Sequence, residues 1–201
     1  MTSSQFFSLH DLKDGFLLRL ESADGTNRLT RDCVLSLQDC IEKIPAAARP
    51  LVNTGNERIF SAGADLLEVA ALNGPAAYEF SKMGQQLMRA IEEFPAPVYA
   101  AISGYCMGGG LDLALACHRR IASPNAVFAH RGAALGLITG WGGTQRLPRL
   151  VGKGIALEIF LTAEKANAQR ALAIGLIDKV AADPVAEAFA RIARNAAAGI
   201  P

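Results

Sequence analysis

Hydrophobic positions recur at helical spacing in two early segments of the chain. After Thr30, which can cap the N-terminus of a helix, apolar residues follow every three or four positions until Pro45 ends the pattern: Val34, Leu37, Ile41 and Ile44. A longer helix is predicted between 75 and 94, opened by Pro75 and closed by Phe94-Pro95. Both segments place one apolar face against a core.

Short apolar runs alternate with these helices. Residues 15 to 21 predict an edge strand, Leu51 to Gly55 a second strand, and Pro97 to Ile102 a buried strand. Loops are predicted at 59–66 and, rich in glycine, at 104–110, where the glycines open an apolar helix. Beyond residue 153 the pattern predicts helices at 155–162 and 167–174, a strand at 175–180 and a last helix from about Pro184. This order is typical of an α/β fold with a parallel sheet and crossover helices.

Composition narrows the class of protein. The chain has 201 residues, 51% hydrophobic and 19% charged, which predicts one compact domain rather than a disordered chain. The net charge is +1 and no basic cluster exceeds Arg119-Arg120, so binding to nucleic acid or to an anionic membrane is not expected. No segment has the pattern of a secretory leader or a membrane span.

The cysteines and histidines do not form a metal-binding pattern. Four cysteines without CxxC spacing and three histidines give no familiar zinc site. We expect the cysteines to be buried free thiols in a reducing compartment, and we predict a cytoplasmic protein with no bound metal.

Glycine is concentrated in the second half of the chain. Eleven of the nineteen glycines fall between 104 and 154, which indicates either tight crossovers or close approach of the backbone to a ligand. The 104–110 loop lacks the Lys and Ser/Thr of a phosphate-binding loop and the spacing of a dinucleotide fingerprint, and 59–63 lacks the first glycine of a nucleophile elbow. The loops at 59–66 and 104–110 can together direct backbone amides at one oxygen atom. The second loop also places the positive end of a helix there.

Three segments carry a family resemblance. FSAGADL at 60–66, AAISGYCMGGGLDLALAC at 100–117 and GGTQRLPRLVG at 142–152 resemble, in order and spacing, the signature segments of the crotonase, or enoyl-CoA hydratase/isomerase, superfamily. The resemblance implies a crotonase-like spiral of ββα units with two roughly perpendicular sheets, here as a core domain over 1–180 followed by a short C-terminal helical segment over 181–201. It implies an acyl-CoA thioester substrate, as in fatty acid metabolism, and no metal or redox cofactor: coenzyme A enters as part of the substrate.

The resemblance also assigns roles to residues. By similarity, the amides of Ala64 and Gly109 bind the thioester oxygen as an oxyanion hole, and Ala62, Ala64, Asp65 and Leu66, together with Gly109, hold coenzyme A. Members of the family form trimers or hexamers through further C-terminal helices. Because the 181–201 segment is short, the sequence does not decide whether this chain forms the same homo-oligomer. It predicts an acyl pocket that is more exposed or is covered by a neighbouring subunit.

The chain departs from the family pattern where the chemistry is expected. Family hydratases use two glutamates; Asp112 stands at the first position and Gly132 at the second. Asp112 is either the acid/base or a residue that only complements the helix dipole. His130, a side chain that titrates near neutral pH, is a candidate second proton carrier or an ordinary core residue, and Arg131 either binds an acyl carboxylate or is simply exposed. Trp141 either narrows the acyl pocket or only packs.

Three functions remain open at this point. The leading one is an enoyl-CoA hydratase, a lyase, with Asp112 as its sole carboxylate acid/base. The second is an enoyl-CoA isomerase or acyl-CoA decarboxylase, for which one proton carrier suffices. The third is a non-catalytic acyl-CoA-binding protein, suggested by the missing carboxylate.

Overall fold

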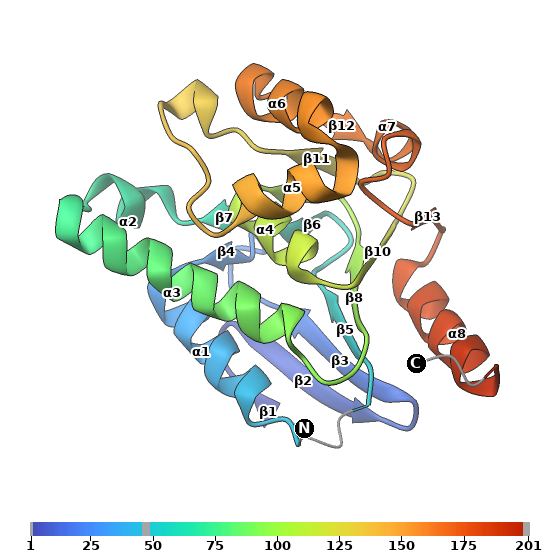
Figure 1. The fold of residues 1–201 in the computed structure, drawn as a ribbon. Helices are drawn as coiled ribbons and strands as arrows, with labels where there is room; N and C mark the ends of the chain where they lie inside the picture. The colour runs from blue at the N-terminus through green and yellow to red at the C-terminus, as the bar shows by residue number, and fades with distance from the viewer. Residues whose placement is uncertain (1, 46–48, 199–201) are drawn as a thin grey trace.

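A seven-stranded sheet forms the body of the protein (Figure 1). The structure is a computed structural model and describes residues 2–45 and 49–198. In spatial order the strands are β1 (Thr2–Ser3), β2 (Phe7–Leu12), β3 (Gly15–Leu20), β5 (Leu51–Thr54), β8 (Val98–Ile102), β10 (Arg119–Ala122) and β13 (Lys179–Val180). The first three are antiparallel, and from β3 onward each strand pairs in parallel with the next.

A second sheet has four strands, in spatial order β12 (Ala166–Asn167), β11 (Val127–Ala129), β9 (Tyr105–Met107) and β6 (Ile59–Ser61). The chain enters it directly after β5, β8 and β10, which gives β6, β9 and β11, and β12 is added later, after a helix. Helices follow these strand pairs, so the predicted spiral of ββα units is confirmed. A further two-stranded pair joins β4 (Arg28–Leu29) to β7 (Gly63–Ala64).

The predicted helices are present with the expected caps. In chain order the helices are α1 (Arg31–Glu42), α2 (Leu66–Ala70), α3 (Gly74–Glu92), α4 (Gly109–Ala116), α5 (Gly143–Val151), α6 (Lys153–Thr162), α7 (Ala168–Ala173) and α8 (Pro184–Ala197), with a 3₁₀ turn at Ala133–Leu135. The Thr30 hydroxyl accepts a hydrogen bond from the Cys33 amide, 3.2 Å away, and starts α1 as the sequence predicts.

The large sheet is covered on both faces because its strands are apolar on both faces. Leu51, Val98 and Ile102 face the main core under α1 and α3. Val52 and Tyr99, among residues that alternate with these, face a second cluster closed by α8, which lies on the opposite side of the sheet (Figure 1). Helix α8 therefore packs on strands of the core, and the boundary at residue 180 stays a prediction.

The structure corrects four expectations. Residues 15–20 are not an edge strand: they pair with β2 on one side and β5 on the other. The sequence reading missed β2 because its polar His10 and Asp11 weaken the apolar alternation. The predicted loops at 59–66 and 104–110 contain the short strands β6, β7 and β9, and the strand predicted at 175–180 is confined to its last two residues. Helix α5 was not expected, because Gly142 precedes it and Gly143 and Pro148 lie within it.

The cysteine prediction is confirmed, since all four cysteines are free and buried. Burial raises the pKa of Cys33 to about 12 and that of Cys117 to about 11, which keeps both thiols protonated at neutral pH. Within 2–45 and 49–198, none of the helices is both long enough and apolar enough to span a bilayer.

Candidate active site

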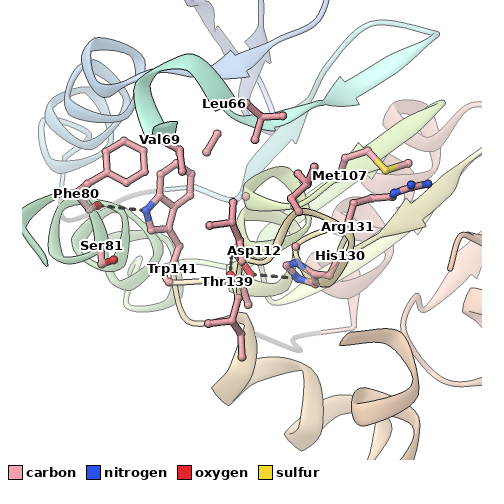
Figure 2. Close-up of a pocket in the computed structure, with 18 of the residues that line it drawn as sticks. Leu66, Val69, Phe80, Ser81, Met107, Asp112, His130, Arg131, Thr139 and Trp141 are labelled. Atoms are coloured by element: carbon pink, nitrogen blue, oxygen red, sulfur yellow. Dashed lines mark hydrogen bonds and ion pairs between the residues drawn. The ribbon is translucent and has the colours of Figure 1, made fainter. Parts of the chain in front are cut away.

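One cavity of about 400 Å³ collects most of the residues singled out in the sequence (Figure 2). Ala62, Ala64, Leu66, Gly109 and Asp112 all line it. Its remaining walls come from α2, α3 and the segment between β11 and α5, and the lining is mainly apolar. A mainly apolar cavity with a few convergent polar groups is the usual form of a small-molecule site.

The two predicted amides lie on neighbouring turns of backbone. Ala64 ends β7, and Gly109 is the first residue of α4. A Cβ on Gly109 would lie 3.2 Å from the Ala64 nitrogen. Because a Cβ is about 2.5 Å from its own nitrogen, the two nitrogens are at most about 5.7 Å apart. One oxygen can accept hydrogen bonds from both nitrogens at that separation.

Close backbone contact fixes this arrangement. Gly63 has φ +88°, and a Cβ there would lie 2.5 Å from the Met107 carbonyl oxygen and 2.8 Å from the Gly109 nitrogen. Only glycine at position 63 lets β7 approach the 107–109 backbone this closely. Helix α4 begins without a side-chain cap, so the first-turn amide of Gly109 has no intrahelical partner and the positive end of the helix faces the cavity.

Asp112 lies one turn into α4 and is almost fully buried, with 1% of its surface exposed. Its Oδ2 accepts a hydrogen bond from the Thr139 hydroxyl, and its Oδ1 lies 3.3 Å from Nε2 of His130. Figure 2 shows the three side chains grouped on one side of the cavity. Carboxylate, imidazole and hydroxyl therefore form one polar cluster in an otherwise apolar wall.

Trp141 forms the wall on the other side of Asp112. It is buried, donates its indole N–H to the Phe80 carbonyl at 3.2 Å, and lies with its ring 5.3 Å from that of Phe80 (Figure 2). Gly84 and Gly109 make room for it, because a Cβ on either would come within 2.5 Å of the indole ring. Trp141 therefore both packs between α3 and α4 and bounds the cavity beside the Gly109 amide.

The remaining predicted residues occupy different places. Arg131 is exposed. Both Arg131 and Gly132 line the cavity. Asp65, predicted to hold coenzyme A, caps α2: its Oδ1 accepts hydrogen bonds from Leu67 N at 2.9 Å and Glu68 N at 3.2 Å. It is not among the residues that line the cavity within the described chain.

Sequence reasoning missed Thr139 as a member of the polar cluster and Gly143 as its neighbour. Thr139 carries no motif signal, and Gly143 was noted only within the glycine-rich stretch and the 142–152 signature segment. A Cβ on Gly143 would lie 2.2 Å from Asp112 Oδ1, so its lack of a side chain shapes the cluster directly. No group of three or more metal-ligating side chains occurs within the described residues.

The sequence of the chain is similar to that of known proteins. The sequence model of the enoyl-CoA hydratase/isomerase family matches residues 16–200. A crotonyl-CoA hydratase of Syntrophomonas wolfei is 39% identical over 167 residues, covering 82% of this chain and 64% of that protein. A probable enoyl-CoA hydratase of Bacillus subtilis is 42% identical over 160 residues, covering 78% of this chain and 62% of that protein. The chain thus spans less than two thirds of the length of these relatives.

Solved structures agree with the sequence comparison. The enoyl-CoA hydratase of Bacillus anthracis superposes with a TM-score of 0.87 at 35% identity, covering 94% of this chain and 77% of that one. DspI of Pseudomonas aeruginosa gives a TM-score of 0.91 at 34% identity, covering 98% and 76%. The match over most of the sequence and the shared fold lead to one conclusion: the chain belongs to the enoyl-CoA hydratase/isomerase family.

Proposed function

We propose that this chain adds water across the double bond of a 2-enoyl-CoA thioester. The observation that carries the proposal is the convergence of the Ala64 and Gly109 amides with Asp112 in one mainly apolar cavity. Related proteins of 39% and 42% identity are named crotonyl-CoA hydratase and probable enoyl-CoA hydratase, which supports the same reaction here.

The amides would stabilise the charge that forms during the reaction. When the oxygen of water bonds to C3, the electrons of the double bond move toward the thioester carbonyl and form an enolate. Each amide donor aimed at that oxygen contributes about 3 kcal/mol in the transition state. The start of α4 adds its partial positive charge at the same place.

Asp112 would move the protons. It is the carboxylate among the described residues that line the cavity, and its position one turn after Gly109 puts it on the same side of α4 as the amide. The Thr139 hydroxyl donates a hydrogen bond to Oδ2 of Asp112. Coenzyme A would enter along the segment from Ala62 to Leu66, where Leu66 is 55% exposed.

The test is hydration of crotonyl-CoA, followed by loss of the enoyl absorbance, in wild type and in Asp112→Asn. We expect kcat to fall by about 10² to 10⁴ in the variant while its affinity for acetoacetyl-CoA stays within twofold, because the amide replaces a proton carrier and leaves the oxyanion site intact. Asp32→Asn is the matched control, since Asp32 is an exposed first-turn residue of α1. Equal activity of wild type and Asp112→Asn would contradict the proposal.

A second candidate is double-bond migration or decarboxylation on the same oxyanion site. It is favoured by the lack of a carboxylate at Gly132 and by the exposed guanidinium of Arg131 at the cavity, which can bind a carboxylate on the acyl group. Product analysis on 3-enoyl and malonyl-type thioesters separates it from hydration. Tight binding of coenzyme A esters with no turnover of any of them would indicate a binding protein instead.

We propose in addition that the protein works in the cytoplasm as a homo-oligomer. The four buried free thiols suit a reducing compartment. Sedimentation equilibrium with and without acetoacetyl-CoA measures the assembly.

A further inference from the structure

Two buried polar atoms in the cavity wall lie near each other and have no hydrogen-bond partner. Asp112 Oδ1 and His130 Nε2 are 3.3 Å apart, and neither atom makes a hydrogen bond within the described part of the chain. The two side chains are 2% and 5% exposed. Burying such atoms without a partner is unfavourable, and a proton held between them would satisfy both.

The surroundings hold the two atoms in this position. A Cβ on Gly143 would lie 2.2 Å from Asp112 Oδ1 and 3.1 Å from His130 Nε2, so α5 can pack against the pair only with glycine there. On the other side the Phe160 ring of α6 lies 5.2 Å from the imidazole ring. The imidazole is therefore packed in place against the carboxylate (Figure 2).

The chain leaves no room for a second carboxylate at position 132. A Cβ on Gly132 would lie 2.7 Å from the Leu137 carbonyl oxygen, because the segment turns back and the Leu137 amide donates to the Gly132 carbonyl at 2.9 Å. A glutamate there would require the backbone to move. Any second proton carrier must come from another residue.

Few groups near the pair can take that role. The ionisable side chains among the described residues that line the cavity are Asp112, His130 and Arg131. Arginine does not release its proton in proteins. Cys106 of β9 lies close to Asp112, but burial raises the pKa of its thiol well above the ordinary value and keeps it neutral. His130 remains.

We propose that His130 is the proton partner of Asp112: the imidazole holds Oδ1 through Nε2 and exchanges a proton with it, so that one carboxylate performs both proton transfers of the reaction. This inference rests on the proposed hydration. Because His130 acts through Asp112, it is a positioning residue and not a group that touches the substrate.

The proton count of the pair balances over one turnover. The pair starts with one proton between Oδ1 and Nε2. The oxygen of water bonds to C3, the electron pair of the double bond moves to form the enolate, and the proton released by water goes to Asp112. The pair then holds two protons and gives one to C2, where the enolate electron pair forms the new C–H bond. One proton remains in the pair, which has returned to its starting state.

The first test is independent of turnover. The chain has three histidines, so nuclear magnetic resonance of histidine-labelled protein gives three sets of ring signals, assigned with His10→Gln, His118→Gln and His130→Gln. In Asp112→Asn we expect the ring nitrogen and N–H proton signals of His130 to shift, because the carboxylate oxygen that faces Nε2 is replaced and the shared proton is lost. The signals of the other two histidines serve as internal controls. Unchanged ring signals of His130 would show that the two groups share no proton and would overturn the proposal.

The second test separates proton exchange from simple support. In His130→Gln the side-chain amide can still donate to Oδ1 but cannot take up or release a proton. We expect kcat for crotonyl-CoA to fall about 10²-fold, with KM and acetoacetyl-CoA affinity within twofold, and the shape of the kcat–pH profile to change. His10→Gln, on β2 away from the cavity, should match wild type.

The outcomes are distinguishable. A His130→Gln variant with kcat within threefold of wild type and the same pH profile would reduce His130 to a support for Asp112. If wild type hydrates no 2-enoyl-CoA, the proposed function fails, and the ring signals of His130 in Asp112→Asn still decide whether the pair shares a proton.

Discussion

The two walls of the cavity are built in different ways. The amide wall, formed by Gly63, Ala64 and Gly109, presents main-chain atoms whose positions follow from the pairing of β7 with β4 and from the start of α4. The acid wall, formed by Asp112, His130, Thr139 and Gly143, presents side chains from three segments that are distant in the sequence.

This difference decides how each wall tolerates change. The amide wall contributes no side-chain atom, so it depends on how closely two backbone segments can approach. The acid wall depends on each side chain separately, because the Asp112 carboxylate contacts the Thr139 hydroxyl and the His130 imidazole through different oxygens. We therefore expect an added side chain at a glycine to damage the amide wall. The acid wall should be damaged both by crowding at Gly143 and by the loss of a single polar atom.

Gly109→Ala should break the amide wall and give the largest effect of the three changes considered below. The new Cβ would lie 2.5 Å from the Trp141 ring and 3.2 Å from the Ala64 nitrogen, so the start of α4 must shift. We expect kcat for crotonyl-CoA to fall by about 10² to 10³, the cost of one lost oxyanion donor. The free energy of unfolding should fall by about 1–3 kcal/mol through overpacking.

Gly154→Ala is the matched control for that change. Gly154 lies in α6, where a Cβ would meet no atom within 4 Å, so the variant should keep full activity and be slightly more stable. Full activity of Gly109→Ala, measured beside this control, would mean that the Gly109 amide does not bind the substrate oxygen.

The fold was largely predictable where local signals and tertiary packing agree. Helices α1 and α3 combine a regular apolar face with capping residues, and the parallel strand β8 is a continuous run of buried, mainly apolar residues. Helix α5 was missed because Gly142, Gly143 and Pro148 all weaken local helix propensity. It forms nonetheless, with Leu147 and Val151 buried on one face, because packing overrides propensity.

The site was predictable from the sequence only in part. The resemblance of the segments around them to the family's signature segments assigned Ala64 and Gly109, and the position of the first family glutamate assigned Asp112. Thr139 and Gly143 could not be found, because the turn that brings the 130–142 segment back onto α4 leaves no local pattern in the sequence. That His130 contacts Asp112 is likewise a property of the folded chain.

Gly143→Ala should damage the acid wall by crowding the Asp112 carboxylate. Its Cβ would come 2.2 Å from Asp112 Oδ1 and displace the carboxylate from its place in the cavity. We expect kcat to fall by about 10- to 100-fold, since a catalytic group displaced by about 1 Å loses up to 10²-fold in rate. Acetoacetyl-CoA affinity should change little, because the amides are untouched. Loss of affinity without loss of kcat would show that Gly143 supports the amide wall and not the acid wall.

Thr139→Val sharpens the comparison by removing a single polar atom. The valine keeps the branched shape but cannot donate to Asp112 Oδ2, so the carboxylate loses one of its two neighbours in the acid wall. We expect kcat to fall about tenfold, equivalent to one hydrogen bond of about 1.4 kcal/mol, with KM unchanged. Thr162→Val is the control, because the Thr162 hydroxyl donates to the Glu158 carbonyl and accepts from the Glu164 amide at the exposed end of α6, and Thr162 does not line the cavity. If both variants keep wild-type kcat, Asp112 is held by His130 and packing alone, and the acid wall reduces to the Asp112–His130 pair.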